Sequence, residues 1–482
     1  MEHHHHHHHK EKKKHMAGKL VTLFQLAVSV VLIAVIWNSG MLPVKYMVPL
    51  IIFLLVLFGV TFGLQFIQKK LTGIIGVVVS LMVSIVLIVG ILYFTKANQA
   101  MENVGGATYK TDNMIVAVKK EDTAKNILDA RDYRFGYQTS MDQENNRLML
   151  EDVAAVSGRE IKLVEFETVT EVAEALLDGR IDAAIYNEAF TGIIEDVVED
   201  YSNQIRILYQ YGIETELEQE ETNVEEAFNV YISGIDVAGP ISTNSRSDVN
   251  IIMTVNPNTK KILLTTTPRD YYVPIPGVSG EARDKLTHAG IYGVDASMAT
   301  LESIYDIDIS YYARVNFTSL ITIVDALGGI DVYSDYAFTT THGKYEIVQG
   351  VNHMDGATAL GFSRERYSFE SGDNQRGKNQ EAVLTAILNK AMSPAILTSA
   401  NQILASVSDC VQTNMTQEEM AKFINMQLSD PASWSIESTA ATGRGDNQPC
   451  FSSGAQLLYV MWPDDAIVGD ISRKIKQVEE GN

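Results

Sequence analysis

Three long apolar runs dominate the first hundred residues of the chain. They cover residues 20–37, 42–67 and 72–94, contain no acidic residue, and include Lys45 as their one basic residue. A membrane-spanning helix needs roughly 20 apolar residues, and each run is about that long. Three successive helices buried in a soluble core are the alternative, but ordinary cores do not use three such runs in a row. The pattern therefore predicts three transmembrane helices within residues 16–97.

The lysines that flank these runs predict how the helices are oriented. Lysines before the first run and between the second and third are Lys19, Lys69 and Lys70, whereas the first loop has Lys45 and the third run is followed by Lys96. Basic residues favour the cytoplasmic side. We therefore expect a cytoplasmic N-terminus and a chain that lies outside the cytoplasm after about residue 97.

Residues 1–15 are typical of an expression tag, since they hold seven consecutive histidines followed by a lysine-rich spacer, and they are not expected to belong to the fold. The histidines that remain downstream are His288, His342 and His353. A histidine-based metal or catalytic centre is therefore not expected.

Charge separates the two ends of the chain. Residues 1–97 carry nine lysines and two glutamates, a net of +7, and the whole chain carries −22, which leaves −29 for residues 98–482. Nucleic-acid binding depends on cationic side chains that neutralise phosphates, so an acidic region of this kind is a poor candidate for it. The charge suits a solvated extracellular region.

Alternating strands and helices follow a polar linker predicted at residues 98–113. The predicted strands are 115–120, 134–138, 161–167 and 183–189, and the predicted helices are 121–130, around 145–156 and around 169–177. This alternation predicts a small α/β accessory domain over residues 114–215. It resembles one lobe of a solute-binding protein, without a sharp motif, and we interpret it as a spacer or a partner-docking domain. An acidic linker is predicted at residues 216–226.

The remaining stretch, residues 227–482, is long enough to bury one sizeable core. It begins with β-rich segments at 228–236, 249–257 and 261–270, and a turn at 256–260 joins the second to the third. Apolar residues recur at helical spacing in two later segments, 317–329 and 380–392. The whole chain is therefore predicted to be an α/β protein with three N-terminal transmembrane helices.

Two aspartates at predicted strand ends are candidate metal ligands. Asp236 ends one strand and Asp248 precedes the next. Mg²⁺ prefers one or two carboxylates together with phosphate oxygens and water, and Mn²⁺ is a possible substitute. Turn formation is the ordinary role of such aspartates, so both interpretations stay open at this point.

Arginines gather in an otherwise acidic region. Arg269 precedes Asp270 at a strand end, Arg364 and Arg366 lie two residues apart, and Arg376 lies four residues before Gln380. Guanidinium groups form bidentate, charge-assisted bonds to phosphate oxygens. Surface salt bridges with the abundant carboxylates are an equal alternative.

Cys410 and Cys450 both lie in the region predicted to be exported, where a disulfide can form. A disulfide between these two cysteines, which lie 40 residues apart, would contribute about 3–4 kcal/mol to stability. Two free thiols are the alternative.

Five motifs, in this order, resemble the LytR–CpsA–Psr family of Gram-positive envelope proteins. They are SGID, SRSDVNIIMTVNPNTKKILLTTTPRD, NFTSLITIVDALGGIDV, MDGATALGFSRERYS and GDNQRGKNQ. The resemblance covers about residues 229–392, and the three spans plus an accessory domain look like the streptococcal capsule-associated members.

The resemblance implies an α/β/α domain with a central mixed sheet and an apolar pocket for a polyprenyl chain. It also implies a phosphotransferase that moves a glycan phosphate from a polyprenyl diphosphate onto peptidoglycan. The glycan would be capsular polysaccharide or another wall glycan, and the enzyme would work at the plasma membrane of a Gram-positive bacterium without a nucleic-acid partner.

The resemblance assigns roles residue by residue. Asp236 and Asp248 would hold Mg²⁺. Arg246, Arg269, Arg364, Arg366, Arg376 and Gln380 would bind phosphate oxygens, and the expected catalytic residues are Arg246, Arg269 and Asp270. The general base is open between Asp248, Asp270 and Asp373. Many members carry a second arginine where this chain has Asn379, so phosphate binding would depend more on Arg376, and Lys378 could compensate only by turning inward.

The two amphipathic segments are the expected lining of the lipid pocket, although apolar residues at helical spacing are more often plain core. The candidates are Phe317, Leu320, Ile321, Val324, Val383, Leu384 and Leu388. Two other functions stay open: hydrolysis of a polyprenyl diphosphate at the same site, and a non-catalytic polyprenyl-phosphate-binding scaffold for capsule assembly.

Overall fold

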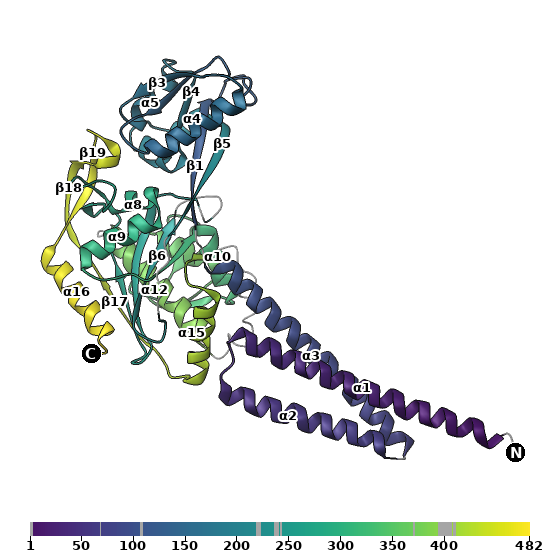
Figure 1. Ribbon diagram of the computed structural model, residues 1–482. Helices are drawn as coiled ribbons and strands as arrows, with labels where there is room; N and C mark the ends of the chain where they lie inside the picture. Colours follow the sequence, from purple (N-terminus) through teal and green to yellow (C-terminus); the bar gives the residue numbers. More distant parts are fainter. Residues whose placement is uncertain are drawn as a thin grey trace. The chain divides into compact units, whose positions relative to one another are not determined.

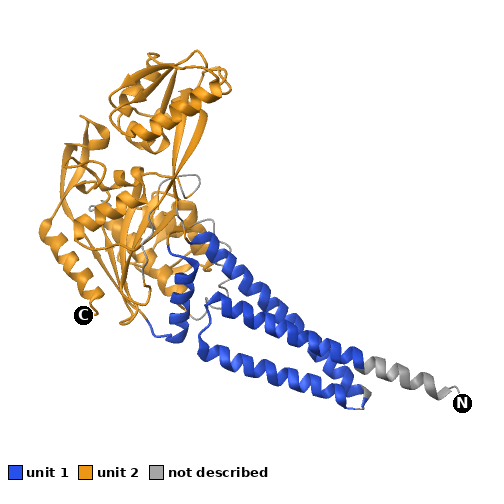
Figure 2. Ribbon diagram, in the orientation of Figure 1, with its two compact units in different colours: residues 1–105, 398–408, 415–433 blue, residues 106–397, 409–414, 434–482 orange. Residues whose placement is uncertain are grey.

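The computed structural model describes residues 3–67, 69–106, 109–217, 223–235, 241, 243–369, 372–393, 407 and 411–482. The chain forms two compact units (Figure 2). The first, here called the membrane unit, comprises Met1–Gly105, Thr398–Ser408 and Met415–Ser433. The second, here called the α/β unit, comprises Gly106–Leu397, Asp409–Asn414 and Trp434–Asn482.

Three long helices build the membrane unit: α1 (His3–Ser39), α2 (Val44–Gly63) and α3 (Lys70–Val104) (Figure 1). A short 3₁₀ turn, η1 (Leu64–Phe66), ends the second apolar stretch. The stretches apolar and long enough to cross a membrane are Met16–Ser39, Val44–Phe66 and Leu71–Val104, which confirms the three predicted spans. Their common core includes Val28, Leu32, Ile36, Met47, Leu54 and Leu87.

The predicted linker at 98–113 is wrong in its extent. The helix α3 continues to Val104, because the stretch from Asn98 to Val104 has no glycine or proline; Gly105 and Gly106 follow, and Gly106 adopts a positive φ of 69°. The strand β1 then begins at Tyr109.

One helix from the C-terminal half belongs to the membrane unit. The helix α15 (Gln417–Ser429) starts at a capping box between Thr416 and Glu419. Its Ala421 is buried against Met41 and Met101. The predicted domain 227–482 is therefore not one continuous unit, because this segment packs on apolar side chains of α3 and of the α1–α2 loop.

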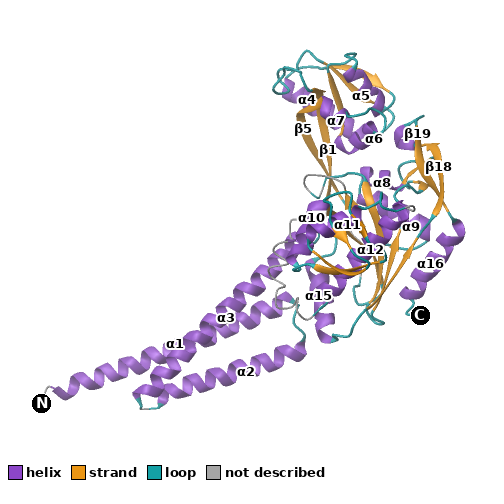
Figure 3. Cartoon of the chain, turned by 180° about the vertical axis from the view of Figure 1, so that it is seen from behind, coloured by secondary structure: helices purple, strands orange, loops and turns teal. Residues whose placement is uncertain are grey.

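The accessory domain contains a five-stranded sheet in the order β3-β2-β4-β1-β5. Figure 3 labels β1 and β5 of this sheet, with strands in orange. Its strands are β1 (Tyr109–Lys119), β2 (Arg134–Gln138), β3 (Lys162–Phe166), β4 (Ala183–Asn187) and β5 (Ile205–Glu216). Its helices are α4 (Gln143–Ser157), α5 (Val169–Leu177), α6 (Thr191–Glu195) and α7 (Tyr201–Gln204), with the 3₁₀ turn η2 (Glu188–Phe190). Alternate residues of β1 feed two cores, one under α5 and the other under α4. The predicted α/β character is confirmed.

The helix predicted at 121–130 is absent, and turns occupy this stretch instead. Side chains there bind the backbone: Asp122 accepts from the N–H of Ala124 at 2.8 Å, and Asn126 accepts from the N–H of Leu128 at 2.9 Å. Such Asx turns compete with helical hydrogen bonds. The fifth strand, β5, was not predicted, although it pairs with the whole length of β1.

The central sheet of the C-terminal part is mixed, with the order β16-β11-β6-β7-β8-β17. Its strands are β6 (Phe228–Ile235), β7 (Ser247–Asn256), β8 (Lys261–Thr266), β11 (Tyr311–Asn316), β16 (Val411–Thr413) and β17 (Ser435–Ala440). Parallel pairs join β6 to β11 and β8 to β17, and the other pairs are antiparallel. The predicted mixed sheet is confirmed.

Helices cover both faces of this sheet. The helices α8 (Leu286–Tyr292), α9 (Val294–Tyr305) and α16 (Asp465–Glu479) share a core with Tyr231, Ile252 and Leu263. The opposite face packs against α12 (Gly372–Ala391), which contacts β8 and β17. The helices α10 (Phe317–Ala326) and α11 (Gly356–Arg364) complete this layer beside α12. Smaller strand pairs are β9 (Tyr272–Pro274) with β10 (Arg283–Lys285), β12 (Ile330–Ser334) with β15 (Gly350–Met354), β13 (Phe338–Thr339) with β14 (Glu346–Ile347), and β18 (Gly443–Pro449) with β19 (Leu457–Pro463).

Candidate functional site

A polar cleft lies at one edge of the central sheet. Because β7 and β8 are antiparallel, the start of β7 and the end of β8 meet at this edge. The N-terminal half of α12 and the end of β17 close it from the other face. The lining residues are Asp248, Asn250, Thr266, Thr267, Pro268, Arg269, Asp270, Arg376, Gly377, Gln380, Ala440, Ala441 and Met461. Five predicted site residues therefore meet here: Asp248, Arg269, Asp270, Arg376 and Gln380.

Asp248 and Arg269 form an ion pair inside the cleft. The Nη1 atom of Arg269 lies 2.9 Å from Asp248 Oδ1, and the hydroxyl of Thr287 donates to the same oxygen at 3.2 Å. Burial alone would raise the pKa of Asp248, but the guanidinium groups of Arg269, Arg246 and Arg376 outweigh it and hold this pKa below its usual value. Asp248 is therefore ionised and already neutralised by arginine.

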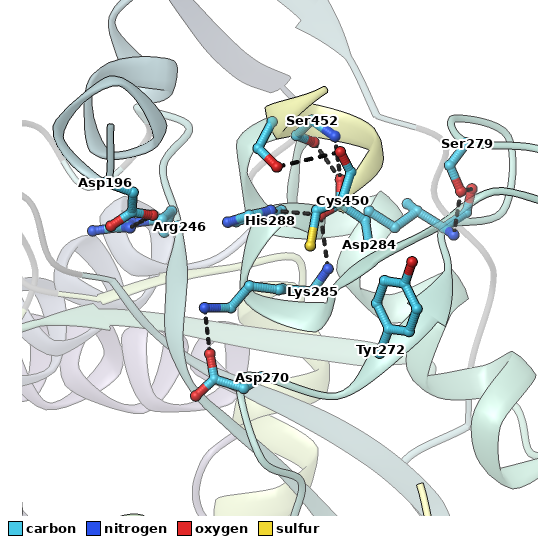
Figure 4. A network of polar contacts seen from close by, with 12 residues as sticks. Asp196, Arg246, Asp270, Tyr272, Ser279, Asp284, Lys285, His288, Cys450 and Ser452 are labelled. Atoms are coloured by element: carbon cyan, nitrogen blue, oxygen red, sulfur yellow. Dashed lines mark hydrogen bonds and ion pairs between the residues drawn. The ribbon is translucent and has the colours of Figure 1, made fainter. Parts of the chain in front are cut away.

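Asp270 is buried and paired. Its Oδ1 lies 2.5 Å from Lys285 Nζ, and its Oδ2 lies 3.8 Å from Arg269 Nε. Figure 4 shows the lysine side chain reaching toward this carboxylate. Each oxygen of this carboxylate therefore faces a cation, and Asp270 is placed to orient Arg269 and Lys285.

A buried network fixes the backbone beside Lys285. The Oδ1 atom of Asp284 lies 2.6 Å from His288 Nδ1, and its Oδ2 accepts from the N–H of Ser452 at 2.8 Å (Figure 4). Burial would raise the pKa of Asp284, but His288 and Ser452 lower it below its usual value. This network joins β10 and α8 to the 3₁₀ turn η3 (Phe451–Ser453) and so positions Lys285.

The helix α12 approaches the sheet closely where it presents its polar residues. A Cβ on Gly377 would lie 3.1 Å from Thr266 Cγ2, so this glycine lets the helix approach the end of β8. Arg376 and Gln380 both line the cleft, as their spacing on one helical face predicts.

Asn379, at the position where many family members carry arginine, is buried and points to α11 instead. Its Nδ2 donates to the carbonyl of Phe362 at 3.1 Å, and its Oδ1 accepts from Gln375 at 3.1 Å. Lys378 is exposed, so it does not turn inward to compensate.

Arg364 is the last residue of α11 and Arg366 lies two residues beyond it, and neither is among the residues that line the cleft. The guanidinium carbon of Arg364 lies 4.1 Å from the ring centroid of Phe317, a cation–π contact. The N–H of Arg366 donates to the buried carboxylate of Glu365 at 3.1 Å. The structure therefore places Arg364 beside α10 and Arg366 next to Glu365, and neither residue lines the cleft.

Arg246 directs its guanidinium toward the accessory domain. Its Nη1 lies 3.4 Å from Asp196 Oδ2 (Figure 4). It does not line the cleft, although its charge contributes to the lowered pKa of Asp248.

The predicted metal site is only partly described. Asp236 lies outside the described residues, as does the side chain of Asp373, and within the described part of the chain no three histidine, cysteine or acidic side chains cluster as metal ligands would. Asp248 offers one carboxylate in a cationic setting. This donor set fits Mg²⁺ only together with phosphate oxygens.

The predicted lipid-pocket residues divide by burial. Val324 and Val383 are buried, whereas the half-buried ones are Phe317, Leu320, Ile321, Leu384 and Leu388. They lie on α10 and α12, two helices that both contact α11. The lipid pocket stays a prediction.

Cys450 is buried, and burial raises the pKa of its thiol to about 12. It forms no disulfide with any residue that the structure describes. Its predicted partner, Cys410, lies outside the described residues, so the disulfide stays a prediction.

Lys285, Thr287, Asn250 and Glu381 belong to the site or its surroundings but were not predicted. Lys285 and Thr287 contact the carboxylates of the cleft, Asn250 lines it, and Glu381 is a buried carboxylate on α12 next to Gln380. Only Glu381 had a local signal, since an acidic residue stands inside an amphipathic helix.

The fold and the cleft define a class: a protein with three apolar helices long enough to cross a membrane and a mixed α/β domain whose polar cleft contains Arg269 and Arg376. The sequence model of the LytR_cpsA_psr family matches residues 197–461, which is more than half of the chain. The chain belongs to this family.

Two relatives are named polyisoprenyl-teichoic acid–peptidoglycan teichoic acid transferase TagU. The relative from Bacillus cereus is 35% identical over 204 residues, which cover 42% of this chain and 65% of the relative. The relative from Enterococcus faecalis is 33% identical over 237 residues, which cover 48% of this chain and 77% of the relative. The chain thus spans slightly less than two thirds of the first relative.

Solved structures give weaker matches. The crystal structure of B. subtilis TagU is 28% identical and covers 52% of this chain and 96% of that chain, with a TM-score of 0.41. The structure of TagT bound to LI-WTA is 26% identical, and the match covers 55% of this chain and 94% of that chain, with a TM-score of 0.43.

Proposed function

We propose that the protein transfers a glycan phosphate from a polyprenyl diphosphate carrier to a peptidoglycan hydroxyl. The observation that carries the proposal is the cleft that gathers Arg269, Arg376 and Gln380 around Asp248. This cleft lies in the domain that follows the accessory domain, here called the family domain, within the residues 197–461 that the family model matches. The two relatives named as teichoic acid transferases support the same reaction class. An acidic protein needs such cationic side chains to bind the negatively charged diphosphate of this carrier.

The reaction would use the cleft for binding and charge stabilisation. The acceptor oxygen forms a bond to the phosphorus next to the sugar, the bond from that phosphorus to the lipid phosphate oxygen breaks, and the acceptor proton passes to a base. Arg269 and Arg376 would stabilise the charge on the departing lipid phosphate, and Gln380 would orient it. Asp270, paired with Lys285, would keep Arg269 in place.

Mg²⁺, with Mn²⁺ as an alternative, is part of the proposal. Asp248 would hold the ion together with phosphate oxygens, and Asp236 is the second expected ligand. When bound, the ion would neutralise phosphate charge and leave Arg269 free to turn from Asp248 to the phosphate.

The partners follow from the substrate. The half-buried apolar residues on α10 and α12 would hold the polyprenyl chain, since lipid burial contributes about 0.8 kcal/mol per CH₂. The membrane unit would anchor the protein in the plasma membrane with its N-terminus in the cytoplasm and the α/β unit outside. The transferred glycan would be a capsular polysaccharide or another wall glycan.

The test uses the full chain in detergent with a polyprenyl diphosphate-linked glycan, a peptidoglycan fragment and Mg²⁺. We expect a covalent glycan–phosphate–peptidoglycan product by mass spectrometry, and Arg376→Ala should slow its formation about 100-fold. Arg444→Ala is the matched control, because Arg444 is an exposed arginine on β18. Activity equal to wild type in Arg376→Ala would contradict the assigned site.

Other results would indicate the two alternatives. Release of lipid phosphate and free glycan phosphate with no peptidoglycan product would indicate a hydrolase. Binding of the lipid without turnover would indicate an assembly scaffold. Organic extraction of the purified protein should yield a polyprenyl phosphate or diphosphate if the cleft and its apolar neighbours bind that carrier.

A further inference from the structure

The segment that leads into β7 is hydrogen-bonded to the accessory domain. The backbone N–H of Asn244 donates to the carbonyl of Thr111 at 3.1 Å, and an isolated bridge joins Thr111 to Thr243. The side chain of Asn244 donates to Asp112 Oδ1 at 3.1 Å, and both residues are buried. The position of Arg246, two residues further on, is therefore set partly by β1 of the accessory domain.

The accessory domain also contacts the guanidinium of Arg246 itself. Asp196, the C-cap of α6, lies 3.4 Å from it, and the two side chains are 36% and 28% exposed. A Cβ on Gly192 would lie 2.6 Å from Arg246 Cζ and 2.7 Å from Arg246 Nε. The guanidinium can occupy its place against α6 because residue 192 has no side chain.

We propose that Asp196 and Gly192 are positioning residues that hold Arg246 on the accessory domain until an anionic diphosphate competes for its guanidinium. This inference rests on the proposed function, since it assigns a regulatory contact to Arg246, which is expected to bind phosphate oxygens of the same donor. One guanidinium cannot make its best bonds to Asp196 and to a phosphate at once. The accessory domain would therefore lower the affinity of the family domain for its anionic donor and would be loosened by donor binding, because coupling of this kind is reciprocal.

The size of the effect follows from the exposure of the pair. Partly exposed ion pairs contribute little, so their loss changes an equilibrium by about two- to five-fold. Asp196→Asn removes the competing carboxylate. Gly192→Ala leaves the charge unchanged and places a methyl group where the guanidinium now lies. Gly192 has no positive φ, so alanine fits the helical backbone.

The experiment measures binding of inorganic pyrophosphate with Mg²⁺ to the full chain by calorimetry, and separately KM and kcat for the lipid-linked donor. Both variants should lower the Kd for pyrophosphate and the KM by about two- to five-fold, with kcat within about two-fold of wild type. Glu195→Gln is the matched control on the same helix, because its carboxylate accepts from Ser202 and not from Arg246.

A second background separates positioning from a general charge effect. In Arg246→Ala, pyrophosphate should bind more weakly than to wild type, and Asp196→Asn should add no further change. An unchanged or weaker affinity in Asp196→Asn would overturn the inference, as would the same gain with Arg246→Ala present. These outcomes depend on pyrophosphate binding alone. A wild-type protein that binds pyrophosphate but transfers no glycan would refute the proposed function, and the affinities of the variants would still test this inference.

Discussion

Glu381 is a carboxylate buried on α12 against the central sheet. It is 5% exposed, and its Oε1 has no hydrogen-bond partner in the part of the chain that the structure describes. Burial raises its pKa above the usual 4.5. Keeping this group ionised in the folded protein therefore costs free energy, because the hydration that the charged form loses outweighs the hydrogen bonds from Thr266 and Ser438.

This cost gives a pH-dependent stability with a defined sign. For a carboxyl group whose pKa is raised by folding, the folded state binds the proton more tightly, so its contribution is fully present below pH 4.5 and is lost as pH rises through the folded-state pKa. We expect Glu381→Gln to melt about 2–4 °C higher than wild type at pH 7, a gain of about 1 kcal/mol, and to match wild type near pH 4.

Thermal unfolding of the detergent-solubilised protein between pH 4 and pH 8 measures this difference. Glu437→Gln is the control, since Glu437 is an exposed carboxylate on the neighbouring strand β17. A constant offset between Glu381→Gln and wild type at every pH would contradict the titration of Glu381.

Single residues show how far sequence reasoning reaches. The spacing of Arg376 and Gln380 predicted a shared helical face, and the structure brings both to the cleft. The same reasoning could not place Arg246 or Arg364, because the side-chain partners of each come from distant segments, Asp196 for the first and Phe317 for the second. The spacing of residues shows which side chains share one face of a helix or strand, but not which other element packs against that face.

The helices of the membrane unit pack around a polar side chain. Gln65 Nε2 donates to the carbonyl of Gly73 at 3.2 Å and lies between α1 and α3. A Cβ on Gly18 or on Gly76 would lie less than 2.5 Å from the amide of Gln65, so both glycines make room for it. Small residues that admit a hydrogen-bonding side chain are a common basis of helix association in membranes.

A larger side chain at this contact should separate the helices. We expect Gly76→Leu to lower the melting temperature of the detergent-solubilised protein by several degrees, because leucine would meet Gln65 and also the backbone carbonyl of Thr61. Gly59→Leu is the matched control, since a Cβ on Gly59 of α2 meets nothing within 4 Å. Equal melting temperatures for the two variants would show that Gln65 does not bind between the helices.

At the scale of elements, long periodic segments were predicted well and short polar ones were not. The strand at 134–138 and the helix at 169–177 have the predicted bounds, since each pattern is bordered by clear polar breaks. The segment 121–130 failed because Asp122 and Asn126 bind the backbone locally, a choice that composition does not reveal. The strand β5 was missed because its alternation is weak and its stability comes from pairing with β1.

At the scale of the molecule, the three apolar spans were predicted, but the C-terminal segments that join them in the membrane unit were not. The segment Met415–Ser433 returns from the family domain to the membrane unit, where Asn425 donates to the carbonyl of Gly40 at 2.9 Å. Its amphipathic pattern equally suits packing on the central sheet, so nothing local indicated the partner. Contacts between residues almost 400 positions apart are beyond the reach of local patterns.

The orientation of the whole chain is the last prediction, and it follows from charge. The lysines at the ends of the spans favour a cytoplasmic N-terminus, and the −29 charge of residues 98–482 suits the outside.

Cysteine labelling tests this orientation. In a Cys410→Ser background, Cys450 should not react with maleimide, because it is buried and its thiol pKa is raised to about 12. A new cysteine in Asp178→Cys, at an exposed position of the accessory domain, should react with a membrane-impermeant maleimide on intact cells whose outer wall admits the reagent. A cysteine in Lys69→Cys, between α2 and α3, should react only after the membrane is permeabilised. Labelling of Lys69→Cys on intact cells would reverse the predicted orientation and place the arginine cleft on the cytoplasmic side, where no peptidoglycan acceptor is available.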